Sequence, residues 1–229
     1  MSTIFERDGR KILFIHIPKA GGTSMRHMLI EEGWNEIENP LIPDHMRTEI
    51  LGDPRSNHQH KTLTGLWKKD WEYEFAIVRN PYERFFSQVK HIYKVMQNHF
   101  PDAQSTIDMF DKVYHINFPE LGIGLDDNHF RPQHHFVDKD TEVFKFEDQV
   151  ESLMTTLVKK NIISSDRTFP HKNVTFKDSP SVIVHWPLVE DIHNKFLSFY
   201  QYDFENFEYS KEVPTYGLSV DWNKLKNNP

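Results

Sequence analysis

The stretch Ile12-Leu13-Phe14-Ile15-His16-Ile17-Pro18-Lys19-Ala20-Gly21-Gly22-Thr23-Ser24 decides the fold of this chain. Five of its first six residues are apolar, and most of these are β-branched or aromatic, which is typical of a short strand buried on both faces. Pro18 ends this strand, because proline has no N–H to donate to a neighbouring strand. Gly21 and Gly22 allow the main chain to turn sharply and to approach a ligand closely.

An amphipathic helix is predicted after the turn, over residues 23–32, and Gly33 follows it as a C-terminal cap. A strand, a glycine turn and a helix N-terminus form an anion site, since free N–H groups and the positive end of the helix dipole point at one place. Lys19 adds a positive charge, and Thr23 and Ser24 add hydroxyl donors. The sequence therefore predicts a phosphate site at this turn. The alternative is an ordinary strand–turn–helix with a solvated lysine.

The order of the residues distinguishes this turn from a Walker A loop. A Walker A loop places its lysine after the glycines. Here Lys19 stands before Gly21 and Gly22. Hydrolysis of a nucleoside triphosphate is therefore not the favoured function.

A second motif reads Phe75-Ala76-Ile77-Val78-Arg79-Asn80-Pro81-Tyr82-Glu83-Arg84-Phe85-Phe86-Ser87. Its first four residues are typical of a buried strand, and Arg79 would emerge at the carboxyl end, where open α/β sheets bind ligands. Pro81 suits the first position of a helix, which the apolar spacing extends to about residue 98. Arg79 offers a planar fork to a phosphate and Ser87 a hydroxyl. The alternative is a capped helix with a surface arginine.

The first motif resembles the 5′-phosphosulfate loop of sulfotransferases that use 3′-phosphoadenosine 5′-phosphosulfate (PAPS). It is most similar to the Golgi-type carbohydrate sulfotransferases and their small bacterial relatives, which carry a His-x-Pro-Lys-x-Gly-Gly-Thr-Ser string. The second motif resembles the 3′-phosphate motif of the same family. The resemblance implies PAPS as donor, 3′,5′-adenosine bisphosphate (PAP) as product and no catalytic metal. It implies donor contacts at Pro18, Lys19, Ala20, Gly21, Gly22, Thr23, Ser24, Arg79 and Ser87.

Two histidines, His58 and His60, precede the second motif. Small bacterial sulfotransferases place a similar histidine-containing stretch there, and His60 falls at the matching place. In those relatives a lysine precedes the histidine, whereas here the order is His60-Lys61-Thr62. His58 therefore remains a competing candidate for the same role. The resemblance implies that this histidine removes the proton of an acceptor hydroxyl, which suits the pKa of imidazole. The alternatives are a solvated polar loop and a metal site, for which no third ligand stands at regular spacing.

Residues 127–136 resemble the Pro-Gln stretch of carbohydrate sulfotransferases, which lies near the acceptor. Arg131, Gln133 and His134 are therefore the candidate acceptor-binding residues. The alternative is a polar loop packed by its phenylalanines.

Other segments complete the expected topology. A hairpin turn is predicted at Asp8-Gly9, a helix over 104–113, a strand over 141–146, a helix that opens at Glu147-Asp148 and runs through residue 158, and a terminal helix over 186–200. The closing pattern of the family is expected to dock the terminal helix on the core; its residues here are Tyr200, Asp203, Phe204, Phe207 and Tyr209.

Composition restricts the possible functions. The chain has 229 residues, a formal net charge of −7 and no cysteine. A net negative charge does not favour nonspecific binding to nucleic acids. The absence of cysteine excludes disulfides and thiolate chemistry. No apolar run is long enough to span a membrane and the start is not a signal peptide, so a cytoplasmic protein is expected.

A single domain over residues 1–229 is predicted, with a three-layer α/β fold of the P-loop-like sulfotransferase type: a mostly parallel sheet with helices on both faces. The resemblance implies transfer of a sulfuryl group from PAPS to an acceptor hydroxyl, with carbohydrate as the acceptor, and a catalytic role for Lys19. Two alternatives remain. One is a noncatalytic protein that binds PAP or another nucleotide. The other is a P-loop-like kinase, for which no acidic Mg²⁺ ligand follows a strand.

Overall fold

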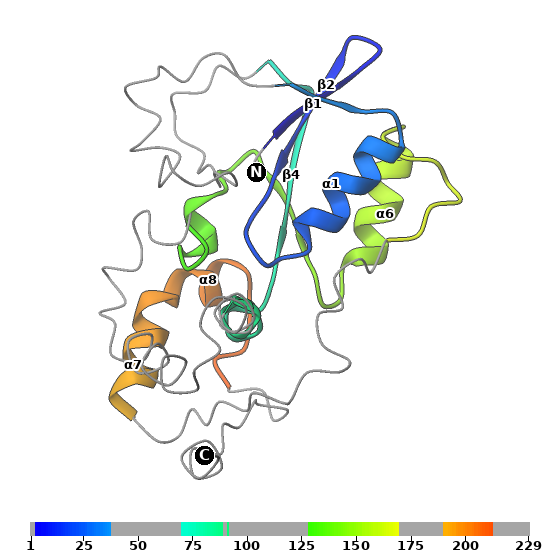
Figure 1. Ribbon diagram of the computed structural model, residues 1–229. Coiled ribbons are helices and arrows are strands. Elements are labelled where there is room, and N and C mark those ends of the chain that lie inside the picture. The colour runs from blue at the N-terminus through cyan, green and yellow to red at the C-terminus, as the bar shows by residue number, and fades with distance from the viewer. Residues whose placement is uncertain (1–2, 38–69, 89–90, 92–127, 170–189, 213–229) are drawn as a thin grey trace, which may run out of the picture.

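The computed structural model describes residues 3–37, 70–88, 91, 128–169 and 190–212 of the chain. Within these residues five strands form one sheet in the order β3-β1-β2-β4-β5 (Figure 1). The strands are β1 (Thr3–Arg7), β2 (Arg10–Ile15), β3 (Asn35–Ile37), β4 (Tyr73–Val78) and β5 (Glu142–Lys145). The strand predictions within the first motif, the second motif and residues 141–146 are confirmed as β2, β4 and β5.

The sheet of the described residues is mixed, so an α/β fold is confirmed but a mostly parallel sheet is not. β2 pairs with β4 and β4 with β5 in parallel, but β1 pairs with both β2 and β3 in antiparallel fashion. The cause is the predicted turn at Asp8-Gly9, where both residues have left-handed φ angles of 54° and 75°. Two such residues form a tight hairpin, which fixes Arg7 opposite Arg10 and makes β1 antiparallel to β2.

Alternating side chains of the strands are buried on both faces of the sheet. On one face Phe14 and Phe75 join an apolar cluster with Met28 of α1 (Gly22–Glu31) and Leu153 of α6 (Val150–Lys159). On the other face the alternate residues of the same strands cluster with Phe136, and with Phe207 beyond α8 (Gln201–Asn206). Figure 1 shows α1 and α6 side by side along the sheet, with α8 away from them. Double-sided burial explains the near-continuous apolar runs of β2 and β4.

The helix predictions hold to within a few residues. α1 begins one residue before its predicted start, and Gly33 follows it with a φ of 84°. Glu147 and Asp148, predicted to open the next helix, form a turn that precedes α6. The predicted terminal helix over 186–200 corresponds in its described part to α7 (Glu190–Phe199), which ends next to the predicted end, and the short helix α8 follows it as a separate element that was not predicted. The predicted helix over 104–113 lies outside the described residues.

Aromatic rings join the helical residues 81–88 to the C-terminal helices. The Tyr82 ring stacks on Phe196 of α7, with centroids 4.9 Å apart, and lies 5.3 Å from Phe204 of α8. Phe85 contacts Phe196 edge-on at 5.4 Å. Burial of these rings fixes the helical part of the second motif against α7 and α8.

Glu32 joins the C-terminal end of α1 to the segment after α6. One carboxylate oxygen accepts hydrogen bonds from the N–H and the hydroxyl of Ser164, at 2.9 and 2.7 Å, and the other accepts one from Nε of Arg167 at 2.5 Å. Burial alone would raise the pKa of Glu32, but these hydrogen bonds outweigh it and the pKa is lowered. The ionised carboxylate therefore stabilises the fold.

We expect Glu32→Gln to lower the free energy of unfolding at neutral pH by about 1–3 kcal/mol, because the amide cannot replace the charge-assisted hydrogen bonds. The folded-state pKa of Glu32 is lower than the unfolded one. The contribution of Glu32 to the free energy of unfolding is therefore complete above the pKa of an unfolded glutamate, about 4.3. This contribution is lost as the pH falls through the folded-state pKa. Urea denaturation at several pH values measures this dependence, which Glu32→Gln should reduce.

Glu31→Gln is the matched control. Glu31 contacts the same Arg167 at 3.2 Å, but its side chain is 45% exposed. Equal losses of stability in the two variants, with the acid dependence unchanged, would contradict the role given to Glu32.

Candidate functional site

The loop between β2 and α1 contains the first predicted site. After Ile17, Lys19 and Gly21 adopt left-handed φ angles of 65° and 85°. α1 then begins without a side-chain cap and with no acidic residue in its first turn. The described part of the chain provides no acceptor for the main-chain N–H groups of Gly22 and Thr23. Free donors and the positive end of the helix dipole are therefore both present at this turn.

Both glycines of the loop lie against aromatic rings. A Cβ on Gly22 would lie 2.0 Å from Cδ2 of His16, and one on Gly21 would lie 2.8 Å from Cε2 of Phe146. The His16 ring is held in turn by Phe14 of β2, on which it stacks with centroids 5.9 Å apart. No side chain fits at either glycine without displacing a ring. No role in the loop was predicted for His16 or Phe146, and the structure shows that their rings lie against its two glycines.

Arg79 follows β4 and lies beside this loop. β2 and β4 run parallel with Ile15 opposite Ala76, so both carboxyl ends lie at the same edge of the sheet. Nη1 of Arg79 is 3.4 Å from the carbonyl oxygen of Lys19, and the guanidinium carbon is 5.4 Å from the centre of the Phe146 ring. Nε of Arg79 is buried without a hydrogen-bond partner in the described ranges. Such a donor is costly unless a ligand or water satisfies it.

The helical residues 81–88 keep one polar stripe accessible. The helix starts at Pro81, as predicted, and its side chains are buried except for Glu83 and Ser87, which are partly exposed. Nη2 of Arg79 pairs with Oε2 of Glu83 at 3.2 Å. Residues four apart lie on one face of a helix. Arg79, Glu83 and Ser87 therefore follow one another on the same side, with Glu83 between the two predicted phosphate-binding residues.

Arg84 belongs to the buried side of this helix and is 1% exposed. Its Nε donates a hydrogen bond to the carbonyl oxygen of Pro18 at 3.0 Å. Its Nη2 donates to the carbonyl oxygens of His129 and Arg131 at 2.8 and 2.7 Å. Burial lowers the pKa of Arg84 from its ordinary value. One guanidinium thus contacts both the first motif and the segment predicted to bind the acceptor.

Gln133 joins that segment to the end of β4. It is fully buried in the short 3₁₀ helix Gln133–His135. Its Oε1 accepts a hydrogen bond from the Arg79 N–H at 2.8 Å, and its Nε2 donates to the Arg79 carbonyl at 2.7 Å. The Gln133 N–H donates to Asp203 of α8 at 2.8 Å. Gln133 therefore fixes the main chain of Arg79; its predicted contact with an acceptor stays a prediction.

The other two predicted acceptor residues lie in one cluster. Nδ1 of His134 is 2.8 Å from Oδ1 of Asp203, and its ring lies 5.4 Å from that of Tyr202, which is 57% exposed. Nε of Arg131 is 3.5 Å from Nδ1 of His135, whose ring lies 4.2 Å from that of His134. Burial, with the neighbouring His134 and Arg131, lowers the pKa of His135 to about 4. His135 is therefore neutral at physiological pH.

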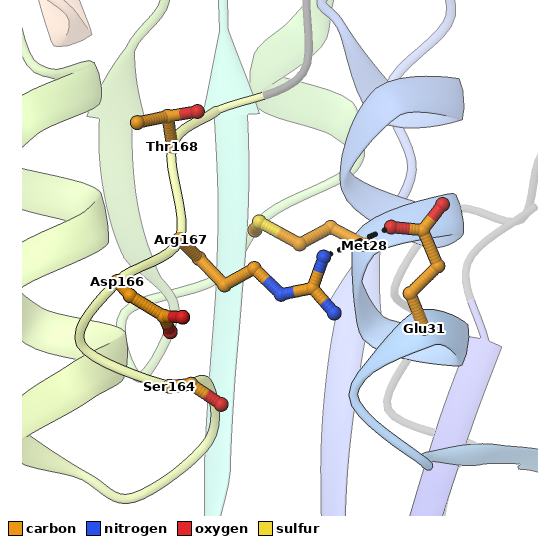
Figure 2. A pocket seen from close by; sticks show the side chains of 6 residues that line it. All are labelled: Met28, Glu31, Ser164, Asp166, Arg167 and Thr168. Atoms are coloured by element: carbon orange, nitrogen blue, oxygen red, sulfur yellow. Dashed lines mark hydrogen bonds and ion pairs between the residues drawn. The ribbon is translucent and has the colours of Figure 1, made fainter.

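A pocket of about 470 Å³ lies beside the C-terminal half of α1. Figure 2 shows Arg167 extending across it toward Glu31. Arg167 also pairs with Glu32, so its charge is balanced by two carboxylates. We do not assign the donor to this pocket, because its lining includes no residue of either motif; the lining residues are Met28, Glu31, Ser164, Asp166, Arg167 and Thr168.

The remaining predicted residues are placed as follows. The Thr23 side chain is exposed, whereas Ser24 is 5% exposed. His58 and His60 lie outside the described residues, and their role stays a prediction. Within the described ranges no group of three or more His, Asp or Glu side chains is placed to hold a metal ion. No helix of that part is long and apolar enough to cross a membrane.

The fold and the two motifs define an α/β protein with a P-loop-like strand–loop–helix at one edge of a mixed sheet. The model of the sulfotransferase family matches residues 2–210, and the chain therefore belongs to that family. Family membership supports a transferase of the sulfuryl-transfer class. Comparisons with curated proteins and with solved structures gave no match.

We expect Gly22→Ala to lower the free energy of unfolding by about 1–3 kcal/mol, because the new Cβ forces the His16 ring to move. Removing the ring with His16→Ala should recover part of that loss. Thermal unfolding of the wild type, both single variants and the double variant measures this coupling. Strictly additive losses would contradict the contact between the ring and the loop.

Proposed function

We propose that this protein transfers a sulfuryl group from PAPS to a hydroxyl group of an acceptor, and that its two motifs bind the donor. The observation that carries the proposal is the position of Arg79, which lies against the carbonyl of Lys19 with its buried Nε unpaired among the described residues. A phosphate oxygen would satisfy that donor with a charge-assisted hydrogen bond. Membership of the sulfotransferase family agrees with such a ligand.

The two ends of the donor would take different residues. For the 5′-phosphosulfate we propose the loop residues Pro18, Lys19, Ala20, Gly21, Gly22, Thr23 and Ser24. Its uncapped helix N-terminus supports this assignment, since the free N–H groups suit an anion. For the 3′-phosphate we propose Arg79 and Ser87. A phosphate there would compete with Glu83, whose Oε2 lies 3.2 Å from Nη2 of Arg79.

The proposed chemistry requires positive charge at the leaving group. PAPS, when bound, supplies a sulfuryl group on a bridging phosphate oxygen, where negative charge gathers as the bond breaks. The Lys19 ammonium and the loop N–H groups would stabilise this charge. The acceptor hydroxyl must lose its proton as the new S–O bond forms. We propose His60 as the base, with His58 as the competitor.

A carbohydrate is the proposed acceptor. The cluster of Arg131, His134 and Tyr202 supports this proposal, because an exposed aromatic ring beside polar side chains suits the apolar and polar faces of a sugar. We also infer that residues 1–229 form one three-layer domain. Apolar clusters on both faces of the sheet support this inference.

Loss of Arg79 should weaken PAP binding. We expect wild type to bind PAP more tightly than ATP or AMP, and Arg79→Ala to reduce PAP affinity by about tenfold or more, as loss of charge-assisted hydrogen bonds predicts. Calorimetric titration measures these affinities. Arg167→Ala is the control, because it removes an equal charge from the pocket in Figure 2. Tighter binding of ATP with Mg²⁺, or no binding of PAP, would contradict the proposed donor.

Loss of Lys19 should slow the chemical step. We expect Lys19→Ala to lower kcat by roughly 100-fold or more, about 3 kcal/mol, because a preorganised charge at the leaving group is lost. Release of PAP from PAPS, measured over a panel of carbohydrates with and without EDTA, tests this. Turnover that is unaffected by EDTA supports sulfuryl transfer, and Mg²⁺-dependent turnover of ATP supports a kinase. PAP binding without turnover on any acceptor supports the noncatalytic alternative.

A further inference from the structure

Arg84 is a charged side chain that is buried and hydrogen-bonded only to main-chain carbonyl groups among the described residues. Within the described part of the chain its hydrogen bonds go to three carbonyl oxygens and to no carboxylate. Removing a guanidinium from water is costly, and the nearby charge of Asp203 offsets only part of that cost, because burial still lowers the pKa of Arg84. A side chain that served only for packing would not need this charge. The three carbonyl groups therefore indicate what the residue does.

The first of these carbonyls belongs to the donor loop. Nε of Arg84 holds the carbonyl of Pro18, and Nη1 of Arg79 approaches the next carbonyl, that of Lys19. Because the C=O and N–H of a trans peptide point in opposite directions, holding the Pro18 carbonyl directs the Lys19 N–H away from Arg84. Lys19 itself has a φ of 65°, an unfavourable angle for a residue with a side chain. Arg84 thus contacts the loop at a point where its shape is strained.

The other two carbonyls belong to the segment that carries the candidate acceptor residues. Nη2 of Arg84 binds the carbonyls of His129 and Arg131, on either side of Phe130. The donor loop and this segment are more than a hundred residues apart in sequence. One planar guanidinium therefore fixes the distance between them.

We propose that Arg84 is a positioning residue, which holds the main chain of the loop at residues 17–20 in its donor-binding shape and fixes segment 128–131 to it. This inference rests on the proposed function of the loop. Lysine cannot replace Arg84 here, since a single ammonium group cannot reproduce the planar fork that reaches carbonyls on two sides.

The test compares Arg84→Lys with Tyr200→Phe. Tyr200 is also buried, and its hydroxyl donates to the carbonyl of Phe130 at 2.6 Å, in the same segment and, among the described residues, not to the loop. We expect Arg84→Lys to lower PAP affinity by about tenfold or more, because charge-assisted hydrogen bonds to the loop are lost. Tyr200→Phe should change PAP affinity by less than about threefold, because it removes one neutral hydrogen bond away from the donor. Calorimetry gives the affinities and thermal unfolding the stabilities.

The outcomes separate this inference from the proposed function. If wild type binds PAP and Arg84→Lys binds it equally well, Arg84 is not a positioning residue, and the proposed function stands. Equal losses of affinity and of stability in both variants would also overturn the inference, since they would reflect general destabilisation. If wild type does not bind PAP, the proposed function fails and the inference fails with it.

Hydrogen exchange of the wild type provides a second test that does not depend on folding of the variant. PAP should slow exchange in peptides that cover residues 16–24 and also in those that cover 128–132, because Arg84 joins the two. Peptides of α6 serve as the reference and should not change. Protection that is confined to residues 16–24 would overturn the inference.

Discussion

The parallel pairing of β2 with β4 is the constraint on which the candidate site depends. This register places Ile15 opposite Ala76, so the two strands end close together at one edge of the sheet. The main chain then turns toward α1 after β2 and toward the helical residues 81–88 after β4. Arg79 consequently reaches the carbonyl of Lys19, although sixty residues separate them. A different pairing would separate the two motifs, however well each formed alone.

A set of buried hydrogen bonds to main-chain groups preserves this arrangement. Gln133 binds both main-chain groups of Arg79, and Asp203 accepts hydrogen bonds from the main-chain N–H groups of Gln133 and His134. Asp203 is fully buried, so loss of any of these bonds would leave an unsatisfied polar group. The C-terminal helix α8 therefore takes part in positioning the second motif. It reaches Arg79 through the 3₁₀ helix, and its Phe204 also packs directly on Tyr82 of the second motif.

The elements that the sequence predicted well are those with a strong local signal. The apolar run of β2, the glycine turn and the start of α1 were predicted because each depends on neighbouring residues. The mixed sheet was missed, although the hairpin turn at Asp8-Gly9 was predicted, because the short polar lead-in was not recognised as a strand. The short helix α8 was not predicted, because the closing pattern over residues 200–209 was expected only to dock on the core. A tertiary contact lies at the boundary between α7 and α8, where the Tyr200 hydroxyl donates a hydrogen bond to the carbonyl of Phe130.

The sequence by itself determined the family, the two motifs and the types of side chain that can bind an anion. Each of these depends on residue identity and short spacing. Only the tertiary structure decided the roles of Arg84, Gln133 and Asp203. Two of them stood in quoted motifs without a binding role, and Gln133 was predicted to contact the acceptor. Their partners are main-chain groups of distant segments, such as the Pro18 carbonyl for Arg84. Every residue has a carbonyl group, so sequence alone cannot show which one a buried side chain binds.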